Sequence, residues 1–223
     1  MWYQQEIQKI RERLINYISG HNSVFATSSF QTHSIPMLHI ISKIDKNIPI
    51  YFLNTGYLFP QTIAYKDLLG ELYGLNILEV SSHVPRSMQK DMNGKLLFAS
   101  DPDHCCDINK VQPMEPLLIK YNVWINGVRA DQNENRKRMG EEMATPQGAL
   151  RYHPMLSWTN KMIWDYIYEM DIPRHPLDAE GYLSIGCEPC TRKFDPEELG
   201  DERMARWFGM AKTECGLHTE LIK

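Results

Sequence analysis

Several features are missing from this 223-residue sequence. It has no run of about 18 apolar residues, so no membrane-spanning helix is expected. The opening residues, MWYQQE, lack the basic and apolar regions of a secretory signal, which favours a cytoplasmic protein. The net charge of −4 argues against the broad basic surface of a nucleic-acid binder. We therefore expect a protein that binds neither membranes nor nucleic acids.

Cysteine is scarce and its number is odd. The five cysteines form an adjacent pair, Cys105 and Cys106, a CxxC pair, Cys187 and Cys190, and a single residue, Cys215. An odd count argues against a closed disulfide framework, and clustered cysteines in the cytoplasm more often bind metal or do chemistry. The two pairs could hold zinc or a [4Fe–4S] cluster, with cysteine count alone slightly favouring zinc. Buried free thiols are the alternative.

Apolar runs alternate with helical patterns along the chain. This alternation predicts an α/β fold with a doubly wound, mostly parallel sheet. We divide the chain into an N-terminal helix (1–22), a nucleotide-binding α/β domain (23–172) and an irregular C-terminal segment (173–223). Strands are expected at 24–26, 48–53, 77–80 and 117–125, and helices at 4–19, 37–44, 61–73 and 157–170.

The segment 27–34 is rich in serine and threonine and lies between an expected strand and an expected helix. Such a turn presents hydroxyl and backbone N–H groups to an anion, and the helix dipole adds to the attraction. The segment 54–56 follows the next strand, and ligands of open α/β sheets bind at the carboxyl ends of strands. Residues 27–34 contain neither a P-loop nor a GxGxxG motif. The alternative is that 27–34 and 54–56 are two ordinary turns between a strand and a helix.

Cationic residues surround Cys215 in the sequence. A nearby positive charge lowers the pKa of a thiol and makes it a better nucleophile. His218 lies three residues after Cys215, and Arg203 and Arg206 are spaced to share a helix face that suits phosphate or sulfate. Lys110 follows the Cys-Cys pair and would place a positive charge beside it. Solvated surface charges are the alternative for each of these residues.

Two further segments are read more simply. Arg129 follows the expected strand end at 124–127 and could meet a nucleotide phosphate or be an ordinary rim arginine. The segment 133–142 is dense in both charges and is interpreted as a solvated face or a mobile loop. His153 and His175 show no metal-ligand spacing and are interpreted as structural.

Taken in order, these motifs resemble the sulfonucleotide reductases, which are the adenylyl-sulfate (APS) and phosphoadenylyl-sulfate (PAPS) reductases. The Cys-Cys and CxxC pairs and the ECGLH motif at 214–218 are the specific parts of the resemblance. The SSFQ loop and the segments NTGYLFPQT, WINGVRADQ and GCEPCT occur in the expected order. The resemblance spans roughly residues 24–218.

The resemblance implies a fold like the adenine nucleotide α-hydrolases (ATP pyrophosphatases) and a [4Fe–4S] cluster, in place of zinc, on the four paired cysteines. It implies that Cys215 attacks the sulfur of APS, releases AMP and becomes an S-sulfocysteine, from which thioredoxin or a glutaredoxin-like dithiol releases sulfite. We expect a homo-oligomer in sulfate assimilation. The implied substrate-binding residues are Ser28, Ser29, Phe30, Gln31, Thr55, Gly56, Lys110, Arg129, Arg203, Arg206 and His218.

Family members with all four cluster cysteines generally use APS, which makes APS the expected substrate and PAPS or dual use the alternative. The chain departs from the family pattern in its SFQTHS loop and at Asn54, Asn109 and Ala130, which bears on the ribose 3′ position. Two other classes remain open. One is a related enzyme of nucleic-acid sulfur modification, and the other is a zinc-binding redox module.

Overall fold

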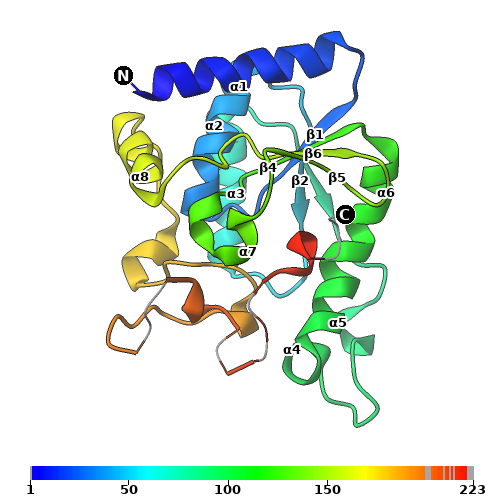
Figure 1. Ribbon diagram of the computed structural model, residues 1–223. Coiled ribbons are helices and arrows are strands. Elements are labelled where there is room, and N and C mark those ends of the chain that lie inside the picture. Colours follow the sequence, from blue (N-terminus) through cyan, green and yellow to red (C-terminus); the bar gives the residue numbers. More distant parts are fainter. Residues whose placement is uncertain (1, 199–201, 208, 211, 213, 220–223) are drawn as a thin grey trace.

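The computed structural model describes residues 2–198, 202–207, 209–210, 212 and 214–219. A six-stranded sheet with the strand order β3-β2-β1-β4-β6-β5 forms its centre (Figure 1). Every neighbouring pair is parallel except β5 and β6, so the predicted fold class is confirmed. The strands are β1 (Val24–Thr27), β2 (Ile50–Leu53), β3 (Ile77–Val80), β4 (Val123–Asn126), β5 (Glu142–Ala144) and β6 (Leu150–Tyr152).

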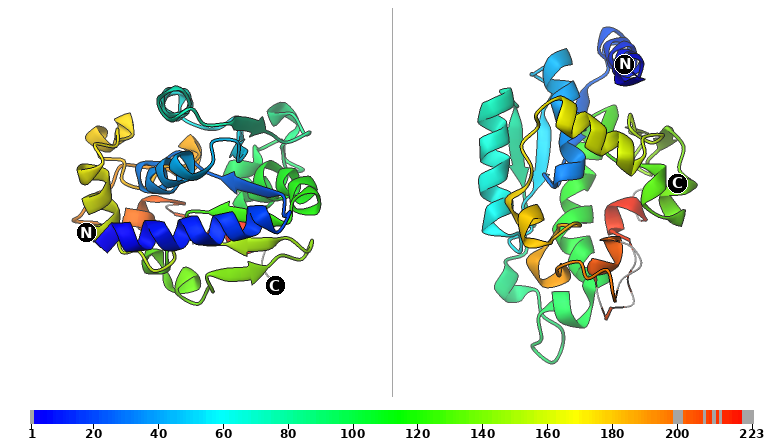
Figure 2. Two further views of the ribbon diagram at one scale, coloured as in Figure 1. Left: turned by 90° about the horizontal axis from the view of Figure 1, so that it is seen from above. Right: turned by 90° about the vertical axis from the view of Figure 1, so that its left-hand side faces the viewer.

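Helices cover both faces of this sheet (Figure 2). Apolar side chains of α1, α2, α3 and α8 form the larger core with one face, and α6 forms a second core with Phe25 and Trp124 on the other. Strands buried on both faces need such apolar cover. The helices are α1 (Trp2–Ser19), α2 (Ile35–Ile44), α3 (Pro60–Tyr73), α4 (Leu97–Ser100), α5 (Pro102–Cys106), α6 (Gln112–Lys120), α7 (Glu134–Lys137) and α8 (Asn160–Glu169).

Local chemistry explains where several of these helices begin and end. Thr159 caps α8, because its side chain accepts a hydrogen bond from the Met162 N–H. Pro60 occupies the first turn of α3, where a missing N–H costs nothing, and Gly74 ends that helix with a positive φ of 62°. Helices α1, α2, α3 and α8 and strands β1, β2 and β3 confirm the corresponding sequence predictions to within a few residues.

The predicted strand over 117–125 is wrong in its first half. Leu117 and Leu118 belong to α6 and pack their side chains into the second core, and the strand β4 begins only at Val123. The continuous apolar run hid the boundary, because a helix and a strand that are both buried look alike in sequence. The α4–α6 stretch, including one π-helical turn at Asp107–Val111, was not predicted.

The C-terminal segment is irregular, as predicted, and runs past the carboxyl ends of the strands (Figure 1). Its described part contains only short 3₁₀ turns, and it is joined to the rest by a bridge between Leu58 and Cys187. A second bridge, between Thr191 and Arg206, folds the segment back on itself. No helix among the described residues is long and apolar enough to cross a membrane.

Candidate active site

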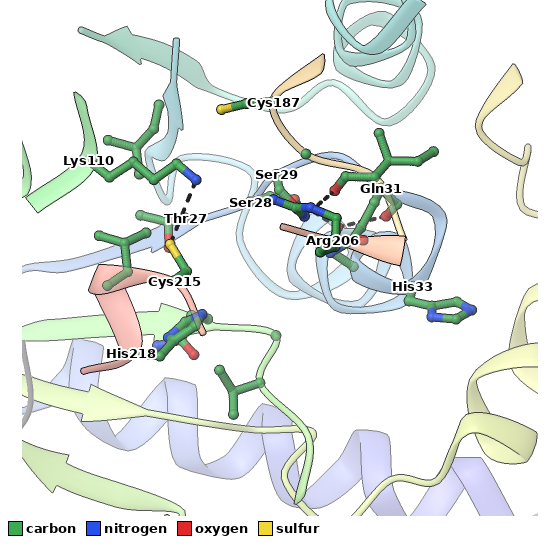
Figure 3. A pocket seen from close by; sticks show the side chains of 18 of the residues that line it. Thr27, Ser28, Ser29, Gln31, His33, Lys110, Cys187, Arg206, Cys215 and His218 are labelled. Carbon is green, nitrogen blue, oxygen red and sulfur yellow. Dashed lines mark hydrogen bonds between the residues drawn. The ribbon is translucent and has the colours of Figure 1, made fainter. Parts of the chain in front are cut away.

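A pocket opens at the carboxyl ends of β1, β2 and β4, where the C-terminal segment covers the sheet (Figure 3). Three cationic side chains line it, and none of the described lining residues is an aspartate or a glutamate. In a chain with a net charge of −4, this composition selects for an anionic ligand. The lining residues that chiefly concern the chemistry are Ser28, Ser29, Gln31, His33, Thr55, Lys110, Asn126, Arg136, Cys187, Arg206, Cys215 and His218.

The loop after β1 supplies the polar wall of the pocket. Ser28 Oγ accepts a hydrogen bond from the Phe30 N–H at 3.0 Å, which curls the loop tightly. Phe30 adopts a positive φ of 53°, and its fully buried ring packs against Phe52. Ser28, Ser29 and Gln31 therefore line the pocket, while the Phe30 side chain anchors the loop in the core.

The turn after β2 meets the CxxC segment. Thr55 lines the pocket, and its Oγ1 lies 3.3 Å from Cys187 Sγ. Gly56 does not line the pocket; it has a φ of 72°, and a Cβ atom there would lie 2.9 Å from Arg86. At the end of β4, Asn126 lines the pocket with an exposed fraction of 4%, and its side-chain amide has no hydrogen-bond partner among the described residues.

Cys215 faces the same pocket from residues 214–219 of the C-terminal segment, which we call the tail. Lys110 Nζ lies 3.7 Å from Cys215 Sγ, although the two residues are 105 positions apart in the chain (Figure 3). A hydrogen bond from the Cys106 thiol, and then the Lys110 charge, outweigh burial and hold the pKa of Cys215 well below its usual value. The same hydrogen bond and burial raise the pKa of Cys106. The structure thus favours a thiolate at Cys215.

The predicted arginines fall in different places. Arg206 lines the pocket, where its guanidinium stacks 4.6 Å from the Trp207 ring centroid and donates to the carbonyls of Ile185 and Cys190. Arg129 is buried and donates to Asp131 at 3.0 Å, and it does not line the pocket. The side chain of Arg203 lies outside the described residues.

Two buried arginines that the sequence reasoning missed hold the tail. Arg136 lines the pocket and forms a buried ion pair with Glu214, so the reading of 133–142 as a solvated face is wrong at this residue. Arg151 is fully buried, stacks 4.5 Å from the Trp124 ring centroid and donates to the Leu217 carbonyl at 3.1 Å. A long-range ion pair leaves no local sequence signal that could have revealed Arg136.

All four paired cysteines line a second cavity beside the pocket, and each thiol is free. The buried hydroxyl of Tyr57 lines this cavity and has no hydrogen-bond partner among the described residues. Burial, and then the nearby Cys187, raise the pKa of the Cys105 thiol to about 11. Among the described residues, no three His, Cys, Asp or Glu side chains converge to hold a single metal ion. The all-thiol donor set around one cavity fits a thiolate-bound cluster.

The fold and the site together define a class of protein. Parallel strands bring hydroxyl and amide groups to one edge of the sheet, as in nucleotide-binding α/β proteins. A thiol activated by a lysine faces the same space. This arrangement can place a thiolate next to an anionic ligand.

Comparison with known proteins places the chain within this class. Residues 23–193 match the model of the phosphoadenosine phosphosulfate reductase domain, and the chain belongs to that family. It is 38% identical over 193 residues to a phosphoadenosine 5′-phosphosulfate reductase of Gloeobacter violaceus, covering 86% of this chain and 80% of the relative. It is also 38% identical over 212 residues to an adenosine 5′-phosphosulfate reductase of Chelativorans, covering 95% and 85%.

Solved structures agree on the fold. The PAPS reductase of Candida auris, in a phosphate complex, superposes with a TM-score of 0.67 at 22% identity over 80% of this chain and 87% of that one. The FMN adenylyltransferase of Candida glabrata superposes with a TM-score of 0.60 at 14% identity over 85% of this chain and 65% of the other. At these identities the likeness concerns the architecture alone, which is the α/β fold with a mostly parallel sheet predicted from the sequence.

Proposed function

We propose that this protein reduces adenylyl sulfate to sulfite and AMP with electrons from a dithiol protein. The observation that carries the proposal is Cys215 Sγ held 3.7 Å from Lys110 Nζ at a pocket lined by cations and by no described carboxylate. The family membership and the adenosine 5′-phosphosulfate reductase relatives at 34–38% identity support the same assignment.

In the first half-reaction, the Cys215 thiolate attacks the sulfur atom of the bound sulfate group. A bond forms between Cys215 Sγ and that sulfur, the bond from the sulfur to the bridging oxygen breaks, and AMP leaves with the electron pair. The sulfonate and the phosphate repel a thiolate, so cations must offset their charge. Lys110 and Arg206 line the pocket in positions to do so.

In the second half-reaction, a thiolate of a thioredoxin- or glutaredoxin-like protein attacks Cys215 Sγ. The bond to the sulfonate sulfur breaks, and sulfite leaves with the electron pair. The second thiol of the reductant resolves the mixed disulfide and restores the Cys215 thiolate. The dithiol is oxidised to a disulfide, and the sulfur of the sulfate group is reduced by two electrons.

The four cysteines around the second cavity, Cys105, Cys106, Cys187 and Cys190, would hold a [4Fe–4S] cluster. A bound cluster would supply charge and rigidity beside the pocket. It would not need to supply electrons, because Cys215 and an external dithiol already complete the electron balance. With Cys106 as a cluster ligand, its thiol would have no proton to donate, and the Lys110 charge would remain to stabilise the Cys215 thiolate. The test is the iron and sulfide content of protein purified without oxygen, compared with Cys187→Ser.

Steady-state sulfite release under anaerobic conditions tests the function itself. With reduced thioredoxin, APS should support turnover with a kcat/KM at least tenfold above that for PAPS, as expected for a member that carries all four cluster cysteines. A preference for PAPS would move the assignment to the alternative named by the Gloeobacter relative. Absence of sulfite with both nucleotides would contradict the reductase assignment. We further propose a homo-oligomer, which light scattering of the same preparation tests.

A further inference from the structure

We propose that Glu214 and Arg136 form a latch that positions Cys215 for attack and that opens before the reductant reaches the adduct. The inference rests on the proposed function, because it assigns the two half-reactions to two positions of the tail. Glu214 and Arg136 are positioning residues here, since the pair acts on the reaction through Cys215. The name latch refers to these two residues only.

The latch has the geometry of a specific and strong contact. Arg136 Nε and Nη2 donate to the two carboxylate oxygens of Glu214 at 2.8 and 2.9 Å, and both side chains are at most 7% exposed. A bidentate pair of this kind fixes orientation as well as distance. Asn133 Nδ2 adds a third bond to the carboxylate at 2.8 Å. The pair joins α7 to the tail across 78 residues of chain.

The same carboxylate holds the backbone of the nucleophile. Glu214 Oε1 accepts a hydrogen bond from the Cys215 N–H at 2.8 Å, so the latch and the nucleophile are connected through one carboxylate group. Beyond Cys215, Arg151 donates to the Leu217 carbonyl and to His218 Nδ1. Buried arginines therefore fix the tail on both sides of Cys215, and among the described residues of the tail the acidic partner, Glu214, belongs to Arg136.

Charge explains why the carboxylate needs its partner. The Glu214 carboxylate lies beside Cys215, where its charge would repel both a thiolate and an anionic substrate. Arg136 offsets this charge within a buried site, where screening by water is weak. The Arg136–Glu214 pair thus positions the tail without adding a net negative charge beside the pocket. Glu214 itself does not line the pocket.

The two half-reactions place opposite demands on the tail. Attack on the bound nucleotide requires Cys215 to face the pocket beside Lys110, which is the position in this structure. Attack by a dithiol protein requires a protein-sized partner to approach Cys215 Sγ, and Cys215 is only partly exposed in this structure. Breaking the latch should therefore slow the first half-reaction and leave the second unchanged or faster.

The decisive variant is Glu214→Gln, which removes the carboxylate charge of the latch, with Glu134→Gln as its matched control. Glu134 is a carboxylate of α7 with a 78% exposed side chain that pairs with Lys137 at 3.4 Å. Single-turnover mixing with APS measures adduct formation, and mixing of isolated adduct with reduced thioredoxin measures sulfite release. We expect adduct formation to slow by about tenfold or more in Glu214→Gln, because a buried ion pair loses one partner. Sulfite release should be equal or faster, and Glu134→Gln should match the wild type in both steps.

A second measurement needs no substrate. Hydrogen exchange of the peptide containing residues 214–218 should be faster in Glu214→Gln than in Glu134→Gln, while the sheet strands keep wild-type protection. This readout tests the latch even if APS proves not to be the substrate. Unchanged tail exchange together with unchanged adduct formation would overturn the latch, and so would equal slowing of both half-reactions.

Two further variants distinguish the latch from misfolding and from a direct contact between Arg136 and the substrate. Asn133→Asp keeps the oxygen that caps α7 but replaces a donor to Glu214 with a repelling oxygen, so it should reproduce the Glu214→Gln pattern. The double variant Arg136→Gln/Glu214→Gln should form adduct no more slowly than Arg136→Gln alone, since the unpaired carboxylate is gone. Additive losses in the double variant would mean that the two residues act separately.

Discussion

The loop after β1 and the cysteine tail face the same pocket, yet different interactions hold them in place. The loop follows a strand that is hydrogen-bonded on both sides, and the ring of Phe30 anchors it in the core. The tail has no strand or long helix among its described residues and depends on single buried contacts from Arg136 and Arg151. Under the proposed function, the loop is the rigid side that binds the ligand, and the tail is the adjustable side that carries the nucleophile.

The largest effect should come from the adjustable side. Among the described residues, the thiols of Cys187 and Cys215 line the pocket, and Cys215→Ser removes the one that lies 3.7 Å from Lys110 Nζ. We expect sulfite release to fall by about 10⁴-fold or more, because a hydroxyl is a far weaker nucleophile than a thiolate. A sulfonate on the serine oxygen could also not be removed by thiol exchange, which cleaves S–S bonds. AMP affinity, measured by calorimetry, should stay within about threefold of wild type, since the β1 loop is unchanged. Retained turnover would place the nucleophile elsewhere.

Lys110→Met separates the charge at Cys215 from the position of the tail. Lys110 lowers the pKa of Cys215, so its loss should raise that pKa and leave less thiolate at pH 7. We expect alkylation of Cys215 by iodoacetamide at pH 7 to slow by about ten- to a hundredfold. Lys120→Met, at an exposed position on α6, is the control and should alkylate as wild type does. An unchanged rate would mean that the lysine does not activate the thiol.

Acid should destabilise the folded protein, because two buried histidines resist protonation in the folded state. Burial lowers the pKa of His153, after β6, and of His175, in the C-terminal segment, to about 4 in the folded protein, against 6.5 for the ordinary side chain. The unfolded state therefore binds more protons between pH 6.5 and 4, so stability is full above pH 6.5 and falls as the pH drops. Each histidine should cost about 2 kcal/mol at pH 5.

Urea unfolding at pH 7.5 and at pH 5.0 measures this loss. His153→Asn and His175→Asn should each reduce the difference between the two pH values, because each removes one group that must take up a proton. His83→Asn, at an exposed position, should leave the difference unchanged. A difference that survives in the double histidine variant would assign the acid sensitivity to other groups.

The smallest effect should come from the rigid side. Ser28→Ala removes the hydroxyl that accepts the Phe30 N–H and lines the pocket. We expect AMP affinity to fall by about tenfold, as one buried hydrogen bond is lost, while iodoacetamide alkylation of Cys215 stays unchanged. Ser100→Ala, at an exposed position, is the matched control. A change in alkylation would show that the loop and the tail are coupled more closely than proposed.

The same contrast explains what the sequence could predict. Buried strands, a capping threonine at Thr159 and the glycine at Gly74 leave local signals, so the first three strands and four helices followed from the sequence pattern, while β5 and β6 were not predicted. The cysteine spacing likewise pointed to one shared cavity. The apolar run at 117–125 misled because a buried helix and a buried strand share composition. Arg136 was missed because its partner Glu214 lies far along the chain and its neighbours are charged.

The intact mass of the protein after anaerobic incubation with APS and no reductant is the most direct test of Cys215 as the nucleophile. We predict a mass gain equal to one sulfonate group on the wild type, none on Cys215→Ser, and loss of the gain when reduced thioredoxin is added. Absence of the gain with both APS and PAPS, or an undiminished gain on Cys215→Ser, would contradict it.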